Sequence, residues 1–180
     1  MAIIDLTGDD KRALLALARQ AILAHLTRGP RPQLESGAAA KHLGAFVSLH
    51  VAGDLRGCIG YIQSDTPLGT VVARCAVSAA ADDPRFPPLT LEELTAAAIE
   101  ISVLGPIEPV RDLDEIVVGR HGLIAAQGYS KGLLLPQVAT EYGWDRDTFL
   151  SHTCLKAGLR ADAWRSGAQI SKFEAVVFGE

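Results

Sequence analysis

Hydrophobic residues recur at two different spacings along the chain, and each spacing predicts its own kind of element. From Thr7 to about Leu26 they recur every three or four residues, which predicts an amphipathic helix capped by Thr7. A second stripe of this kind follows Thr66-Pro67, where proline suits the first helical turn, and it ends at residues 82–84. Most residues of these two stripes are expected to face the core. The stripes consist of Leu14, Leu17, Ala18, Ala21, Ile22, His25, Leu68, Val71, Val72, Cys75 and Ala79.

Strict alternation of apolar and polar residues appears elsewhere and predicts strands. Residues 44–51 and 55–62 alternate on either side of Gly53-Asp54, which is the pattern of a β-hairpin. The next part of the chain predicts a short helix capped by Thr90 and Glu93 and a strand over 98–104. The last part predicts a second hairpin over 122–127 and 132–135, helices that start at Pro136 and after Asp145, and a closing strand over 170–178. This order predicts an α+β fold with an antiparallel or mixed sheet flanked by helices.

The first hairpin can pair in two side-chain phases, and a shift by one residue sends every side chain to the opposite face. A two-residue turn at Gly53-Asp54 would place Arg56 on the apolar face, which is costly without a partner. A three-residue turn at residues 52–54 gives one apolar face and brings His50 opposite Arg56 and Ser48 opposite Cys58. We favour this second register. Its apolar face would carry Val47, Leu49, Val51, Leu55, Ile59 and Tyr61, and its other face Phe46, Ser48, His50, Arg56, Cys58 and Gly60.

Four polar or reactive side chains would then share one face of the hairpin. An arginine near a thiol favours the thiolate, which is the nucleophilic form, so we interpret Cys58 as a candidate nucleophile and Arg56 as an anchor for an anion. Glycine within a strand often marks the close approach of a ligand or chain segment. The further candidate contacts for a ligand on this hairpin are Ser48 and His50, which share the face of Arg56 and Cys58, and the glycines Gly57 and Gly60. The alternative is that Cys58 packs as a small hydrophobe while Arg56 makes a structural ion pair.

The segment Asp82-Asp83-Pro84-Arg85-Phe86 adds charged groups on a turn. Asp83 and Arg85 could form the rim of a site for a polar ligand. The alternative is a structural turn that ends the preceding helix and is held by these two side chains, since Asp and Pro both belong in turns.

Composition narrows the possible classes of function. A chain of 180 residues with 48% hydrophobic residues is expected to form one domain, and a net charge of −4 argues against a nucleic-acid partner. The sequence shows neither an apolar run of membrane-spanning length nor a secretory leader, so we expect a soluble cytoplasmic protein. The three cysteines lack metal-ligand spacing, and no Walker A or GxGxxG motif is present. The sequence therefore predicts no metal site and indicates no cofactor.

The hexapeptide Leu55-Arg56-Gly57-Cys58-Ile59-Gly60 resembles the signature of the AMMECR family, known in bacteria and archaea as AmmeMemoRadiSam system protein A. Residues 83–86, 100–104, 132–138 and 154–159 resemble further blocks of that family, in the same order. The resemblance implies one AMMECR-type domain over residues 1–180, with a larger and a smaller intertwined lobe and the signature strand at the cleft between them. It also implies a Memo-like protein and a radical-SAM enzyme as partners.

The resemblance brings no accepted reaction, so two classes of function stay open. The first is a site for a small polar metabolite, binding or catalytic, built on Arg56 and Cys58. The second is a non-catalytic accessory module that docks one of the two partners through the same strand.

Overall fold

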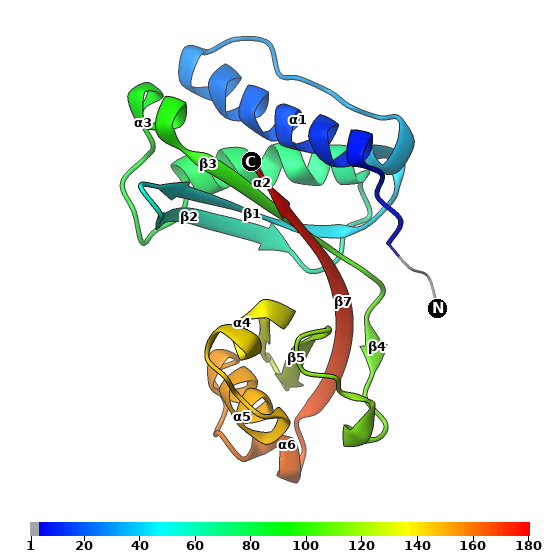
Figure 1. The fold of residues 1–180 in the computed structure, drawn as a ribbon. Helices are drawn as coiled ribbons and strands as arrows, with labels where there is room; N and C mark the ends of the chain where they lie inside the picture. The colour runs from blue at the N-terminus through cyan, green and yellow to red at the C-terminus, as the bar shows by residue number, and fades with distance from the viewer. Residues whose placement is uncertain (1–3) are drawn as a thin grey trace. The chain divides into compact units, whose positions relative to one another are not determined.

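The computed structural model describes residues 4–180 and divides them into two compact units (Figure 1). Unit 1 contains residues 4–104 together with Val176–Glu180, and unit 2 contains Gly105–Ala175. Unit 1 is therefore formed by two separate segments of the chain, which flank unit 2 in the sequence. The predicted α+β class is confirmed, because both units combine helices with antiparallel strands.

In unit 1, β1 (Gly44–Val51) pairs antiparallel with β2 (Asp54–Tyr61) on one side and β3 (Ala98–Leu104) on the other. The end of β7 (Gln169–Gly179) lies next to β3. The helices α1 (Gly8–Thr27) and α2 (Leu68–Ala81) cover one face of these strands (Figure 1). The short α3 (Leu91–Ala96) carries the predicted capping box of Thr90 and Glu93 and leads into β3. Between α1 and β1 lies the 3₁₀ turn η1 (Gly37–Ala40).

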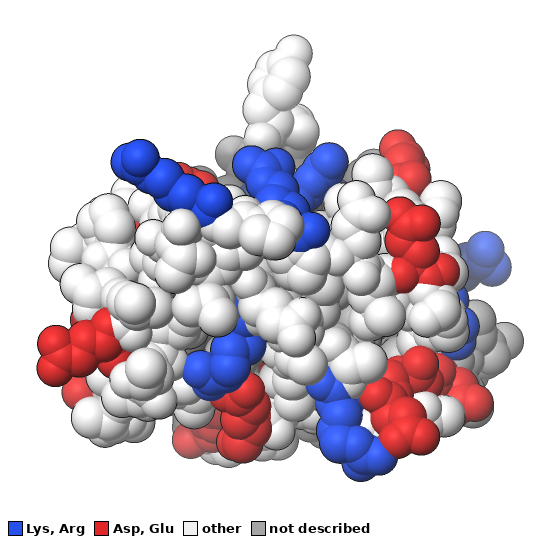
Figure 2. Space-filling view, turned by 90° about the horizontal axis from the view of Figure 1, so that it is seen from above, with Lys and Arg blue, Asp and Glu red and all other residues white. Residues whose placement is uncertain are grey.

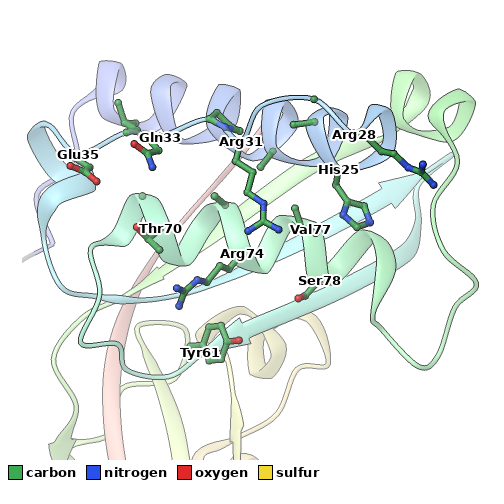
Figure 3. Close-up of a pocket in the computed structure, with 17 residues that line it drawn as sticks. His25, Arg28, Arg31, Gln33, Glu35, Tyr61, Thr70, Arg74, Val77 and Ser78 are labelled. Carbon is green, nitrogen blue, oxygen red and sulfur yellow. The ribbon is translucent and has the colours of Figure 1, made fainter.

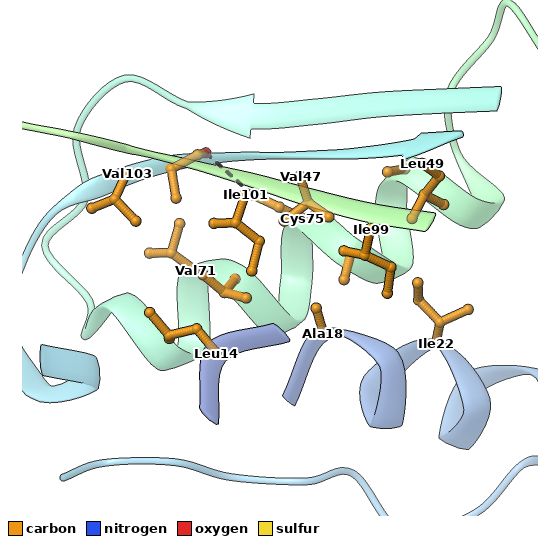
Figure 4. Packing of buried hydrophobic residues seen from close by; sticks show 14 of the residues in the cluster. Leu14, Ala18, Ile22, Val47, Leu49, Val71, Cys75, Ile99, Ile101 and Val103 are labelled. Atoms are coloured by element: carbon orange, nitrogen blue, oxygen red, sulfur yellow. Dashed lines mark hydrogen bonds between the residues drawn. The ribbon is translucent and has the colours of Figure 1, made fainter. Parts of the chain in front are cut away.

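The core of unit 1 follows from the two spacings of the sequence. Every second residue of β1 and β3 points to the helices, and Val47, Leu49, Ile99 and Ile101 are buried there (Figure 4). The helical stripes supply the opposite side of this core, with Leu14, Ala18, Ile22, Val71 and Cys75. Full burial of an aliphatic side chain contributes about 1.5–3 kcal/mol, so these contacts dominate the stability of the unit.

Helix α1 is amphipathic rather than apolar on all sides. Thr7 and Asp10 form its capping box, as the predicted helix start requires, and Arg28 in the left-handed conformation follows its last turn. In the described part of the chain, no helix has both the length and the apolar composition needed to cross a membrane.

Unit 2 is organised around β5 (His121–Gln127), which pairs with β6 (Ser130–Leu134) on one side and with β7 (Gln169–Gly179) on the other. The predicted second hairpin is thereby confirmed. Its helices are α4 (Pro136–Glu141), α5 (Arg146–Lys156) and α6 (Ala163–Ser166), around a core that includes Leu123, Phe149 and Leu150. The short β4 (Glu108–Pro109) and η2 (Leu113–Glu115), like α6, had no counterpart among the predicted elements.

The turn of the first hairpin differs from both predicted turns. Ala52 and Gly53 form it, with φ of 53° and 88°, and Val51 pairs with Asp54. Two-residue hairpin turns with positive φ at both positions are favoured by asparagine and glycine, so an alanine gave no indication of this turn.

A β-bulge then restores the predicted register in the body of the hairpin. His50 pairs with Leu55, Leu49 pairs with Gly57, and Arg56 is the extra residue between them. Ser48 faces Cys58 as predicted, whereas the predicted pairing of His50 with Arg56 is wrong. Leu55 is 39% exposed, because it lies beyond the bulge rather than on the buried face.

Candidate functional site

Cys58 and Ser48 form a close pair on the half-buried face of the hairpin. The backbone N–H of Cys58 donates to the Asp83 carboxylate at 2.9 Å instead of to β1, so Ser48 and Cys58 face each other as a non-hydrogen-bonded pair. Facing side chains come closest in such pairs. Ser48 Oγ accordingly donates a hydrogen bond to Cys58 Sγ at 3.1 Å. Cys58 is half-buried, whereas Cys75 and Cys154 are buried, so Cys58 is the accessible thiol.

Asp83 joins the turn after α2 to the signature strand. Its side chain is only 2% exposed, and its two oxygens accept hydrogen bonds from the backbone N–H groups of Cys58 and Arg85 and from the Arg85 guanidinium. Arg85 Nη2 also donates to the carbonyl oxygen of Cys58 at 3.3 Å. The turn therefore bonds both outward-facing backbone groups of Cys58. This geometry agrees with the second of the two interpretations of residues 82–86, a structural turn held by the side chains of Asp83 and Arg85.

The charges of this pair are strongly coupled. Hydrogen bonds from Arg85 hold the pKa of the Asp83 carboxyl well below its usual range, and they outweigh the burial that acts in the opposite direction. The same contact raises the pKa of Arg85. Arg85 nevertheless keeps 53% of its side chain exposed. The Arg85 guanidinium is thus fixed at the backbone of Cys58 by its pairing with Asp83, and it remains accessible to solvent.

Arg56 reaches away into contacts within the protein. Its Nε and Nη2 donate to the Glu93 carboxylate at 2.8 and 3.1 Å, and Nη1 donates to the carbonyl oxygen of Pro87 at 2.8 Å. Its side chain is 14% exposed, and its hydrogen bonds lower the pKa of Glu93. These contacts fit the structural ion pair that was the alternative for Arg56. Bulges commonly redirect a side chain, and this one directs Arg56 to α3 and the loop before it.

The variant Arg56→Lys tests this structural role. Lysine keeps the charge but cannot reproduce the planar fork on Glu93, so we expect a loss of about 1–2 kcal/mol in the free energy of unfolding. Urea unfolding measures the loss. Because Arg56 does not contact the thiol, the rate of Cys58 alkylation in the folded variant should stay within about twofold of the parent. A large drop in that rate at unchanged stability would restore Arg56 as a ligand anchor.

The glycines of the strand are required by packing inside unit 1. A Cβ at Gly57 would lie 2.0 Å from the carbonyl oxygen of Ala79 in α2, and a Cβ at Gly60 would lie 2.3 Å from the Phe46 ring. Close approach of a chain segment, one of the two reasons for glycine in a strand, therefore accounts for both positions. Ligand contacts at Gly57, Gly60 and the half-buried His50 stay predictions.

The side chains that converge near Cys58 are suited to binding an anion and to thiol chemistry. Ser48 supplies a hydrogen-bond donor to the sulfur, and Arg85 supplies the positive charge. Across residues 4–180, no group of three or more His, Cys, Asp and Glu side chains is arranged to hold a metal ion.

Comparison with known proteins places the chain in a family. The AMMECR1 family model matches residues 15–178. The chain belongs to the AMMECR1 family. Among the family's proteins, Mbar_A1807 of Methanosarcina barkeri is 45% identical over 97% of this chain and 92% of its own. A protein of Methanothermobacter thermautotrophicus is 42% identical over 100% of this chain and 99% of its own.

A solved structure of an AMMECR1-type chain has the same fold. The crystal structure of the uncharacterized protein PH0010 from Pyrococcus horikoshii superposes with a TM-score of 0.90 at 39% sequence identity. The match covers 97% of this chain and 93% of that one. The family membership expected from the hexapeptide is therefore confirmed, and no activity comes with it.

Proposed function

We propose that this AMMECR1-family chain uses the signature strand as a thiol site for a small anionic or polar metabolite. Cys58 is the nucleophile, Ser48 holds its sulfur, and Arg85 anchors the anion. The observation that carries the proposal is the exposed Arg85 guanidinium fixed on the backbone of Cys58, the residue with the accessible thiol. Arg56 has a positioning role in this proposal, because its donors are engaged by Glu93, Pro87 and Pro88.

The site can hold an anionic group at the residue that carries the thiol. Arg85 donates to the carbonyl oxygen of Cys58 and keeps 53% of its side chain exposed, so its guanidinium can also bind an anion there. The other two cysteines are poor competitors, since burial raises the pKa of Cys75 to about 12 and also raises the pKa of Cys154. In the folded protein, alkylation should therefore report on Cys58 alone.

Alkylation by iodoacetamide between pH 6 and 9 tests the proposal. In this reaction the Cys58 thiolate displaces iodide and forms a carbon–sulfur bond. We expect fast labelling in the parent, loss of that labelling in Cys58→Ser, and a decrease of about threefold to tenfold near pH 7 in Arg85→Gln. Mass spectrometry of the labelled peptides measures each rate.

Arg120→Gln is a matched control for Arg85→Gln, because Arg120 is 55% exposed and also pairs with a carboxylate. It lies in unit 2 and should leave the rate unchanged. Unaltered labelling in Cys58→Ser would contradict an activated Cys58, and equal rates in the two arginine variants would contradict the role of Arg85.

Docking of a Memo-like or radical-SAM partner through this strand is the alternative that the resemblance suggests. The geometry favours it less, because the turn carrying Asp83 and Arg85 already bonds the outward N–H and C=O groups of Cys58. Strand addition at Cys58 would have to displace that turn. Recovery of a partner with the parent but not with Cys58→Ser or Arg85→Gln would favour the docking role over metabolite binding.

A further inference from the structure

Unit 1 contains a groove whose lining includes no residue of the signature hexapeptide. A groove of about 640 Å³ lies between the C-terminal half of α1, residues 28–35 and α2 (Figure 3). We call residues 28–35 the strap. In Figure 3, Arg31 extends from the strap toward α2, where Arg74 lies, and His25 and Arg28 lie at the end of α1.

The arginines of this groove are unpaired, unlike others in the same unit. Arg19, Arg56 and Arg85 each form an ion pair with a carboxylate, whereas within residues 4–180 no ion pair involves Arg28, Arg31 or Arg74. Glu35 is the acidic residue among those that line the groove. Positive charges that line a concave site concentrate their field there and attract anions.

This concentration of charge is local, not a property of the whole protein. The net charge of the chain is −4, and the face shown in Figure 2 mixes basic and acidic side chains without a continuous basic surface. A broad polyanion such as a nucleic acid would need such a surface. The groove therefore fits a small anion.

The strap is held in place, so the groove is preformed. Its start is fixed by the hydrogen bond from the Gly29 N–H to the carbonyl oxygen of Ala24, which closes the end of α1. Its far end lies against α2, where only a glycine at position 69 leaves space for the carbonyl oxygen of Leu34. Two prolines, Pro30 and Pro32, restrict the backbone between these points. Preformed sites bind with a smaller loss of conformational entropy.

Stabilisation of the helix C-terminus does not account for this arrangement. A cation near the last turn of a helix is favourable, and His25 and Arg28 occupy such positions on α1. Arg74, however, lies in the middle of α2, and Arg31 belongs to the strap. A ligand shared by Arg31 and Arg74 explains better why two arginines without ion pairs line one groove.

The lining also indicates the rest of the ligand. Small apolar side chains of the two helices form part of it, namely Ala21, Ala24, Ala73 and Val77. Tyr61 and the hydroxyl-bearing residues Thr70 and Ser78 also line the groove. Arginine forks match the oxygens of a phosphate, and the apolar patch can cover a carbon skeleton. We propose that the groove binds a small organic phosphate, with its phosphate group on Arg31 and Arg74.

Calorimetric titration with inorganic pyrophosphate tests the phosphate part of this site. We expect the parent to bind with a Kd of about 0.1–1 mM at low salt. Arg31→Gln and Arg74→Gln should each weaken binding about fivefold to tenfold, since each removes a charge-assisted contact. Arg111→Gln, at an exposed arginine in unit 2 that lies outside the groove, should change the Kd by less than about twofold.

Citrate is the second probe, because it carries carboxylates instead of phosphate. Weaker binding of citrate than of pyrophosphate supports the phosphate class, and equal binding contradicts it. The site itself is contradicted if about 10 mM pyrophosphate gives no binding to the parent, or if the Arg31 and Arg74 variants bind as the parent does. All of these variants are exposed surface substitutions, so loss of folding does not compete with this test.

Discussion

Gly57→Ala is expected to destabilise unit 1 by about 2–3 kcal/mol, although it adds a single methyl group. The new Cβ would lie 2.0 Å from the carbonyl oxygen of Ala79 and 3.0 Å from its carbonyl carbon. Both are backbone atoms of α2, so neither can rotate away as the end of a side chain would. Either the helix or the strand must shift, and a shift of α2 also disturbs its packing on β1. Urea unfolding followed by far-UV circular dichroism measures the loss.

Gly8→Ala provides the matched control for this prediction. A Cβ at Gly8 meets only the flexible end of Arg12 at 3.5 Å, and alanine favours a helix, so this variant should be as stable as the parent or slightly more stable. A Gly57→Ala protein with parental stability would mean that α2 does not approach the strand this closely.

The sequence predicted the strands and helices of unit 1 well, because their hydrophobic spacing coincides with burial. Val47, Leu49, Ile99 and Ile101 alternate and are all buried. The turn at Ala52-Gly53 escaped prediction, since its backbone conformation is unusual for alanine. The bulge at Arg56 was not predicted either. The shorter turn and the bulge each shift the register by one residue in opposite directions, so Ser48 and Cys58 still face each other.

The partners of charged residues were harder to predict than the elements that carry them. Glu93 was recognised as a helix cap from its spacing to Thr90, yet nothing local relates it to Arg56, 37 residues earlier. Likewise, Arg31 and Arg74 line one groove only because of the packing of α1 on α2 and the path of the strap. By contrast, Asp83 and Arg85 are two residues apart, and their contact was among the predicted alternatives.

Asp83→Asn is expected to lower the free energy of unfolding by about 2–4 kcal/mol at neutral pH. The buried carboxylate accepts a hydrogen bond from the backbone of Cys58 and a bidentate pair from Arg85. An amide keeps the shape but loses the charge, and it presents an NH₂ group where an acceptor is needed. Urea unfolding at several pH values measures the effect. The same variant should also slow Cys58 alkylation, because Arg85 loses the group that fixes it.

The dependence of this effect on pH separates it from a general packing defect. Because the pKa of Asp83 is lower in the folded protein than in the unfolded chain, its stabilising contribution is complete well above about pH 4 and declines as the pH falls toward the folded-state value. The difference between parent and Asp83→Asn should therefore shrink on acidification from pH 6 to pH 2. Asp82→Asn, at an exposed position one residue earlier, should show little difference at any pH. A gap for Asp83→Asn that stays constant with pH would assign the loss to shape rather than to charge, and Arg85 would then not depend on Asp83 for its place beside the thiol.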